Sequence, residues 1–234
     1  KNDSIVAVYP LPSMQELYLE DNEICDINDE WLQSMTQLRV LSLSHNKLRR
    51  LNASLFDENV FSELHSLFVD HNQIEHIPRV VKRNGAVGDG SKMVDLRLQK
   101  NLICEIEEGQ LFSQWPQLTN ILLNNNRLTQ LPEDVGCLTR IEELYLQCNQ
   151  LTSLPSSIGQ LTQLKELDLY SNKLQTIPNE IGKLTLLKKL MLDNNELVSM
   201  PTEIINLTNL QLFSFRNNDN LQASPYLLAM RTDK

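Results

Sequence analysis

Apolar residues recur along the chain with a fixed period, which is clearest between Leu131 and Leu210. Each unit there opens with Leu-Pro, Ile-Pro or Met-Pro, and successive units begin at Leu131, Leu154, Ile177 and Met200, a constant step of 23 residues. A fixed period of about 20 to 50 residues indicates stacked structural repeats, each of which buries its apolar face against its neighbours. The hydrophobic pattern therefore predicts a repeat array.

The same apolar spacing extends over most of the chain as nine copies of Leu-x-x-Leu-x-Leu-x-x-Asn-x-Leu. The copies begin at Met14, Leu38, Leu64, Met93, Leu118, Ile141, Leu164, Leu187 and Leu210. Within Leu-x-Leu, alternation places both leucines on one face of a short strand. Nine such strands stacked in parallel are predicted to form one sheet with a shared apolar interior.

Every copy keeps an asparagine after the strand, where the chain is expected to turn inward. These asparagines are Asn22, Asn46, Asn72, Asn101, Asn126, Asn149, Asn172, Asn195 and Asn218. A side-chain amide offers both a donor and an acceptor, and buried peptide groups outside a sheet need partners. The nine asparagines are therefore predicted to form a structural ladder of hydrogen bonds to the backbone of adjacent repeats.

The segment between strands reads close to Leu-Pro-x-x-Ile-Gly-x-Leu-Thr in the regular copies. Its proline suits the first position of a helix, and its glycine suits the end of a single turn. The prolines are Pro132, Pro155, Pro178 and Pro201, and the glycines are Gly136, Gly159 and Gly182, while the last copy has no glycine in this turn. We therefore predict an α/β fold, with a curved parallel sheet inside and short helical turns outside.

The ends and one insertion depart from the repeat. Residues 1–13 are expected to form an N-terminal capping segment, residues 14–216 the nine repeats, and residues 217–234 a C-terminal cap. Ser224 and Pro225 would begin a short helix in that cap. Residues 82–92 carry three glycines within six residues and are predicted to form a poorly ordered excursion from the repeat array.

Residues 14–218 resemble a leucine-rich-repeat solenoid, a horseshoe whose concave sheet usually binds protein partners. The Leu-Pro-x-x-Ile-Gly-x-Leu-Thr-x-Leu subtype is similar to intracellular members, which include Ras-binding and Scribble-type scaffolds, plant Ras-group proteins, Roco proteins and some bacterial effectors. Extracellular members usually carry cysteine-rich caps, whereas the four cysteines here are scattered: Cys25, Cys104, Cys137 and Cys148. A reduced, cytoplasmic protein is therefore expected.

The charge balance narrows the choice of partner. A formal net charge of -9 argues against a nucleic-acid partner, whose binding face would be basic, and against an anionic membrane surface. The chain contains no apolar run of the roughly 20 residues that a membrane span requires, so no membrane insertion is expected. A protein partner and a monomeric state are the predictions that fit these limits.

The repeat alignment identifies the side chains that should point away from the core on the sheet. Aromatic and apolar residues lie among charged ones there, which is typical of a binding hot spot. The excess of acidic residues favours a partner with a basic patch. We predict these partner contacts: Phe68, Arg97, Leu122, Glu143, Tyr145, Glu166, Asp168, Tyr170, Lys189 and Met191.

Histidines are the main candidates for metal chemistry. His45 and His71 occupy the same slot in successive repeats, with Asp21 before them and Lys100 after, so they are expected to stack about 5 Å apart. A closed zinc site needs four ligands, and Asp70 is the only obvious third candidate. We therefore interpret both histidines as exposed residues of the sheet rim, and we expect neither a metal nor a cofactor.

Catalytic motifs do not emerge from the sequence. The stretch from Gly85 to Lys92 ends in Gly-Ser-Lys, whereas a phosphate-binding loop ends in Gly-Lys-Ser or Gly-Lys-Thr. We predict a non-enzymatic signalling scaffold that presents a rigid surface to a protein partner. Two alternatives stay open: a recognition or regulatory segment of a larger GTPase, ubiquitin ligase, cyclase or nuclease, and a self-associating structural protein.

Overall fold

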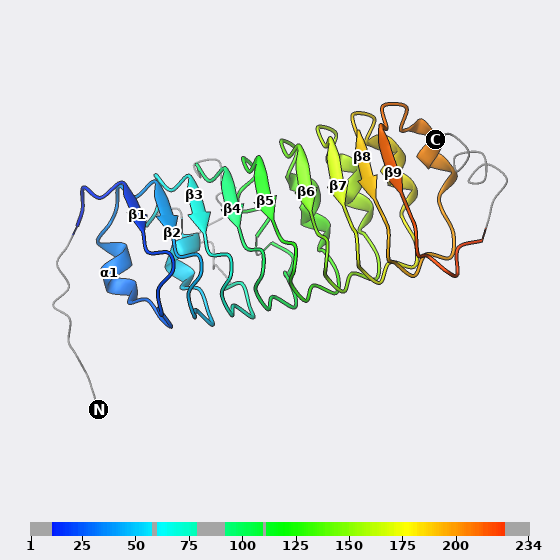
Figure 1. Ribbon diagram of the computed structural model, residues 1–234. Coiled ribbons are helices and arrows are strands. Elements are labelled where there is room, and N and C mark those ends of the chain that lie inside the picture. The colour runs from blue at the N-terminus through cyan, green and yellow to red at the C-terminus, as the bar shows by residue number, and fades with distance from the viewer. Residues whose placement is uncertain (1–10, 58–59, 79–91, 110, 223–234) are drawn as a thin grey trace.

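The computed structural model describes residues 11–57, 60–78, 92–109 and 111–222, which form one row of stacked repeats (Figure 1). Nine strands pair in parallel and in chain order. They are β1 Glu16–Tyr18, β2 Val40–Ser42, β3 Ser66–Phe68, β4 Asp95–Arg97, β5 Asn120–Leu122, β6 Glu143–Tyr145, β7 Glu166–Asp168, β8 Lys189–Met191 and β9 Leu212–Ser214. The predicted curved solenoid with a parallel sheet is confirmed.

The core is one continuous apolar column beneath the sheet. Leu144 and Leu146 flank Tyr145 in sequence and are fully buried, as are Leu167 and Leu169 in the next repeat. The central residues of neighbouring strands pair directly, for example Leu144 with Leu167. Because the leucines of every strand meet the same interior, the register of the whole sheet follows from the alignment of the repeats.

Short helical turns connect the strands on the other side of the core. They are α1 Asp29–Gln33, η1 Ala53–Phe56, η2 Glu133–Cys137, η3 Ser156–Gln160, η4 Asn179–Lys183 and η5 Thr202–Asn206, the last five being 3₁₀ turns. The prediction of short turns is confirmed, but the placement of the prolines is wrong by one residue. Each proline precedes its turn in an extended conformation, as Pro155 does with a ψ of 155° before η3.

The glycines in these turns serve a different purpose from the one predicted. Within the described ranges the only glycine with a positive φ is Gly109, so the turn glycines are not needed for a left-handed backbone. A Cβ on Gly159 would lie 2.6 Å from the carbonyl oxygen of Glu180, and a Cβ on Gly182 would lie 2.6 Å from that of Glu203. Glycine is therefore needed because the turn of the next repeat packs directly against its Cα.

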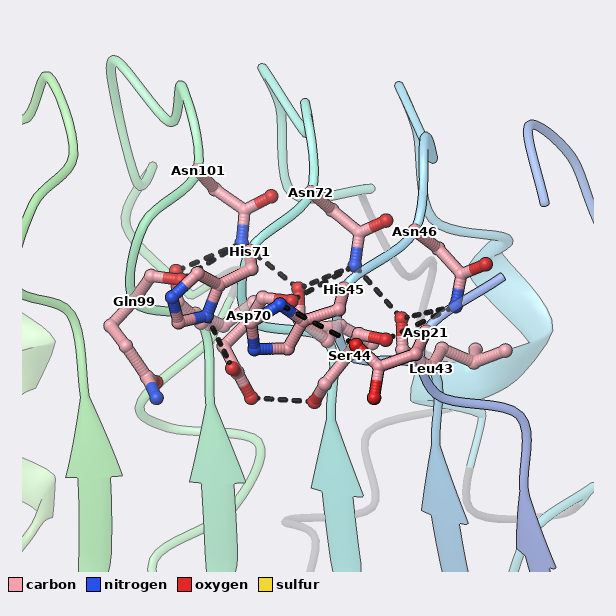
Figure 2. Close-up of polar contacts among 12 residues, drawn as sticks. Asp21, Leu43, Ser44, His45, Asn46, Asp70, His71, Asn72, Gln99 and Asn101 are labelled. Atoms are coloured by element: carbon pink, nitrogen blue, oxygen red, sulfur yellow. Dashed lines mark hydrogen bonds and ion pairs between the residues drawn. The ribbon is translucent and has the colours of Figure 1, made fainter. Parts of the chain in front are cut away.

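Eight of the nine predicted asparagines form the ladder and join every pair of adjacent repeats, whereas Asn22 in the first repeat bonds only carbonyls of its own repeat. The Nδ2 of Asn149 donates to the carbonyl of Leu123 in the preceding repeat and to that of Leu146 in its own, both at 3.0 Å. Its Oδ1 accepts the N–H of Leu128, also in the preceding repeat, at 3.0 Å. Figure 2 shows the same arrangement for Asn46, Asn72 and Asn101, whose amides point to carbonyl oxygens.

The residue before each asparagine has a left-handed backbone, with φ between 52° and 57°. This conformation turns the chain inward after the strand, and aspartate, asparagine and histidine adopt it more readily than most side chains. We call this position the left-handed slot. Its occupants are Asp21, His45, His71, Lys100, Asn125, Cys148, Ser171, Asn194 and Asn217.

Several predictions fall outside the described residues. Most of the N-terminal capping segment, nearly all of the 82–92 insertion and the helix expected at Ser224 are among them. At the edge of the insertion, Lys92 Nζ lies 2.6 Å from Glu63 Oε1. In the part of the chain that the structure describes, the helices are too short or too polar to cross a bilayer.

Replacing Asn149 with alanine should lower the free energy of unfolding by about 2–4 kcal/mol, because one buried N–H and two carbonyls lose their partner. Urea unfolding followed by circular dichroism measures the change. Asn22→Ala is the matched control, since Asn22 is exposed and, in the described part of the chain, bonds only the Leu19 and Glu20 carbonyls of its own repeat. Equal losses in both variants would contradict the bridging role.

Gly159→Ala should destabilise the protein by about 1–3 kcal/mol, the usual cost of overpacking, because its methyl group meets backbone atoms. Ile205→Ala provides the control at the equivalent position of the last turn, where the 57% exposed side chain of Ile205 shows that a Cβ is accommodated. Thermal unfolding of both variants distinguishes close packing from a requirement of the turn itself. A neutral Gly159→Ala would contradict close packing.

Candidate functional site

Six of the ten predicted contact residues form one aligned row across the sheet. Phe68 pairs with Arg97, Arg97 with Leu122, and Leu122 with Tyr145 in successive strands. The row continues from Tyr145 to Asp168 and on to Met191. Flanking rows hold the remaining predicted residues, and Glu143, Glu166 and Lys189 lie side by side on β6, β7 and β8. We call this surface the sheet face.

Tyr145 lies at the centre of a hydrogen-bonded group on the sheet face. Its hydroxyl donates to Glu143 Oε2 at 2.9 Å and lies 3.4 Å from Glu166 Oε2. Glu166 Oε1 in turn lies 2.6 Å from Lys189 Nζ. Burial, and then the hydrogen bond to Glu143, raise the pKa of Tyr145, so its hydroxyl stays neutral and keeps donating. We call these four residues the Tyr145 network.

Tyr170 and Met191 complete the apolar part of this region. Met191 is half-buried beside Asp168, with which it pairs in the sheet. Tyr170 leaves the end of β7 and is 40% exposed. Together with half-buried Tyr145 they present two aromatic rings and a thioether on three consecutive repeats. We call Tyr145, Tyr170 and Met191 the central patch.

Asp168 differs from its prediction as an exposed contact residue, because it is buried. Its Oδ1 accepts the backbone N–H of Tyr170 at 2.9 Å, which fixes the chain where Tyr170 emerges. Burial raises the pKa of Asp168, the hydrogen bond from Tyr170 opposes that shift, and the charge of Asp193 adds to it. Asp168 therefore positions Tyr170 rather than offering a free charge to a partner.

A second cluster occupies β3 and β4. The Arg97 guanidinium lies 4.2 Å from the centre of the Phe68 ring, a cation–π contact. Arg97 also reaches Asp95 Oδ2 at 3.2 Å, and Asn120 Nδ2 donates to Asp95 Oδ1 at 2.8 Å. Phe68 and Arg97 are thus held against each other, and neither is a freely moving side chain.

Several carboxylates of the sheet face are already bound to other groups of the protein, so the acidic excess of the sequence is not fully available to a partner. The carboxylates of Asp95 and Glu166 each contact a cationic side chain of the sheet. Asp193 Oδ1 accepts the Ser214 hydroxyl at 2.5 Å and the Arg216 N–H at 2.7 Å. These pairings leave other carboxylates to set the charge that a partner meets.

Two exposed glutamates of the sheet face are each hydrogen-bonded to a tyrosine hydroxyl. Glu143 and Glu16 are both exposed, and each accepts a hydrogen bond from a tyrosine hydroxyl, from Tyr145 at 2.9 Å and from Tyr18 at 3.1 Å. Tyr18 is 55% exposed and was not among the predicted contacts. Its signal was present in the sequence, because β1 and β6 both read Glu-Leu-Tyr.

Comparisons with known proteins agree with this architecture. Residues 12–74 match the family model described as leucine rich repeat, and residues 116–224 match the one described as leucine-rich repeat region. Residues 12–74 and 116–224 are therefore leucine-rich-repeat regions. The more specific 23-residue intracellular subtype stays a prediction, because these matches identify the repeats in general.

Similar leucine-rich-repeat chains come from several sources. The chain is 33% identical over 137 residues to human podocan-like protein 1. This match covers 57% of this chain and 24% of that protein. It is 29% identical over 129 residues to mouse keratocan, covering 55% and 34%. The match thus spans about a quarter to a third of these relatives. An internalin from Listeria monocytogenes shares the fold with a TM-score of 0.72 at 23% identity, over 95% of this chain and 60% of that one.

The buried carboxylate of Asp168 gives a pH-dependent prediction. Since burial raises the pKa of Asp168 above its ordinary value of 3.8, the folded protein binds this proton more tightly than the unfolded one. The contribution of Asp168 to stability is therefore present below the ordinary pKa and lost as pH rises through the folded pKa. Asp168→Asn should be more stable than wild type near pH 7, and the difference should shrink near pH 3.

Urea unfolding at both pH values measures this difference. Glu23→Gln is the control of opposite sign, because the hydrogen bond from Lys47 lowers the pKa of Glu23. Removing that exposed charge should slightly reduce stability at neutral pH. A stability gain for Asp168→Asn that is the same at both pH values would exclude the burial of its charge as the cause.

Proposed function

We propose that this chain is a non-catalytic protein-interaction module that binds its partner through the concave sheet face. The observation that carries the proposal is the central patch, in which Tyr145, Tyr170 and Met191 lie on consecutive repeats of a rigid sheet. Aromatic and methionine side chains within a polar rim are enriched at protein interfaces and dominate their binding energy. The Tyr145 network supplies such a rim.

Rigidity favours tight binding at this position. The hydroxyl contacts of Tyr145 hold its ring in place, and the Asp168 contact to the Tyr170 N–H fixes the backbone beside the patch. A partner therefore immobilises few side chains on binding, which reduces the entropy that association costs. The apolar rings can then contribute most of their burial to affinity.

The negative charge beside the central patch indicates the kind of partner surface that would bind there. The exposed carboxylate of Glu143 adjoins the patch, while Glu166 is already paired with Lys189. A lysine or arginine of the partner would meet Glu143 beside the Tyr145 hydroxyl. We therefore propose a partner with a basic patch, whose association rate falls as salt screens the attraction.

A cytoplasmic signalling scaffold remains our proposal for the cellular setting. Cys25, Cys104 and Cys148 are free thiols that belong to different repeats. Free thiols of this kind persist in reducing compartments. We also propose that the chain is a monomer.

The triple variant Tyr145→Ala, Tyr170→Ala and Met191→Ala should weaken partner binding by about 100-fold or more, because hot-spot side chains contribute about 2 kcal/mol or more each. Partners are first captured by the wild-type chain and identified, and the affinity of each purified partner is then measured by calorimetry. Thermal stability should stay nearly unchanged.

A second triple variant controls for the loss of exposed apolar surface as such. Leu186, Val198 and Ile205 are 41%, 41% and 57% exposed and lie outside the strands. Replacing all three with alanine should leave the affinity for the same partner intact. Loss of binding in this variant alone would move the interface off the sheet face, and concentration-dependent dimers that vanish with the central patch would indicate self-association.

A further inference from the structure

A cluster of metal-binding residue types lies at the rim of the sheet, apart from the central patch. His45 and His71 occupy the left-handed slot after β2 and β3, and their rings stack with centroids 3.9 Å apart at an interplanar angle of 15°. The shared backbone conformation sends both side chains in the same direction, and parallel pairing brings them together (Figure 2). The sequence alone predicted this adjacency.

Asp70 was the third candidate ligand in the sequence, and the structure shows how its carboxylate is oriented toward the rings. Asp70 is buried, and its Oδ2 lies 2.7 Å from His71 Nδ1. Its Oδ1 accepts the hydroxyl of Ser44, from the equivalent position of the preceding repeat, at 2.6 Å. Asp70 is thus aimed at the imidazole by a hydrogen bond from another repeat. A buried carboxylate held in this way is one that a cation would stabilise.

A second carboxylate stands on the other side of the stack. Asp21, in the left-handed slot after β1, has its Oδ1 3.8 Å from His45 Nδ1. The Asp21 side chain is 82% exposed and is therefore able to move toward an ion. The rim consequently carries two imidazoles between two carboxylates on three successive repeats.

We propose that His45, His71 and Asp70 bind a divalent late transition-metal ion such as Zn²⁺, with Asp21 able to enter as a fourth ligand. One donor atom from each of the three residues lies within 4.8 Å of the others. Two nitrogens that bind one zinc ion at about 2.0–2.1 Å lie about 3.3 Å apart. Small rotations of the half-exposed rings, which separate the stack, bring the donors to that spacing.

The donor chemistry selects the class of ion. Imidazole nitrogens with carboxylate oxygens suit zinc, copper and nickel, whereas calcium and magnesium prefer sites made of oxygen alone. The ion takes the place of a proton between Asp70 Oδ2 and His71 Nδ1, and that proton leaves to solvent. Because His45 is about half exposed, one coordination position faces outward, where water or a donor from another molecule completes the shell.

Metal binding is tested on the untagged chain after removal of metal with EDTA. Competition with a chromophoric zinc chelator gives the affinity, and Co²⁺ substitution gives a visible spectrum that reports the ligands. The wild-type chain should bind one Zn²⁺ ion. His45→Asn and His71→Asn should each weaken binding by at least about tenfold, and the double variant should abolish it. Asparagine is chosen because it occupies the same left-handed slot at Asn125, Asn194 and Asn217.

The other two described histidines supply matched controls. His65→Asn should leave zinc affinity unchanged. His76→Asn should also leave it unchanged, and this variant tests the competing pair in which His76 Nδ1 lies 4.0 Å from Cys104 Sγ. A loss of binding confined to His76→Asn would overturn the proposal.

A thermal readout separates ligand loss from misfolding. Without metal, the double variant should melt at the wild-type temperature. Added Zn²⁺ should raise the melting temperature of the wild-type chain and not that of the double variant. Failure of the wild-type chain to bind zinc at micromolar concentration, or equal affinity in the double variant, would refute the site. None of these results depends on the partner proposed for the sheet face.

Discussion

The asparagine ladder is the interaction on which this structure depends. Each strand is three residues long, so the sheet satisfies only a short run of peptide groups before the chain turns inward. The carbonyls and N–H groups of that turn are buried and would otherwise cost about 1–3 kcal/mol each if left without partners. One amide per repeat bonds three of them, two in the preceding repeat and one in its own.

The ladder also constrains the residue before each asparagine. For the amide to reach inward, the chain must turn through a left-handed conformation, and nine non-glycine residues adopt it with almost the same φ. Their side chains therefore leave the sheet rim in the same direction, one per repeat. The His45–His71 stack follows from this backbone requirement, and the proposed metal site uses a geometry that the fold imposes for another reason.

The sequence predicted the features that follow from the repeat period of the chain. Strand positions, the register from Glu16 to Leu212 and the shared slot of His45 and His71 follow from the repeat alignment, and all nine strands have the predicted alignment. Apart from the His45–His71 stack, contacts between side chains of neighbouring repeats were not predicted, because they depend on rotamers. The burial of Asp168, the contact between Phe68 and Arg97, and the Ser44–Asp70 bond are of this kind.

The role of the turn glycines shows the same limit. Glycine at a helix end suggested a conformational role, whereas Gly159 is required because the backbone of Glu180 approaches it. A single repeat does not reveal how closely its neighbour packs. The loss of the glycine in the last copy, where Ile205 stands, was the available clue, because the described chain has no later helical turn beyond that position.

The distance between the proposed metal site and the central patch is comparable to the width of a typical protein interface. Strands β2 and β8 are six spacings apart, about 29 Å at about 4.8 Å per strand. A typical interface of about 800 Å² on each partner is about 30 Å across. A single partner domain whose interface begins at Met191 and extends over the strands toward β2 would reach the rim at His45. In that arrangement the same rigid sheet would support both contacts.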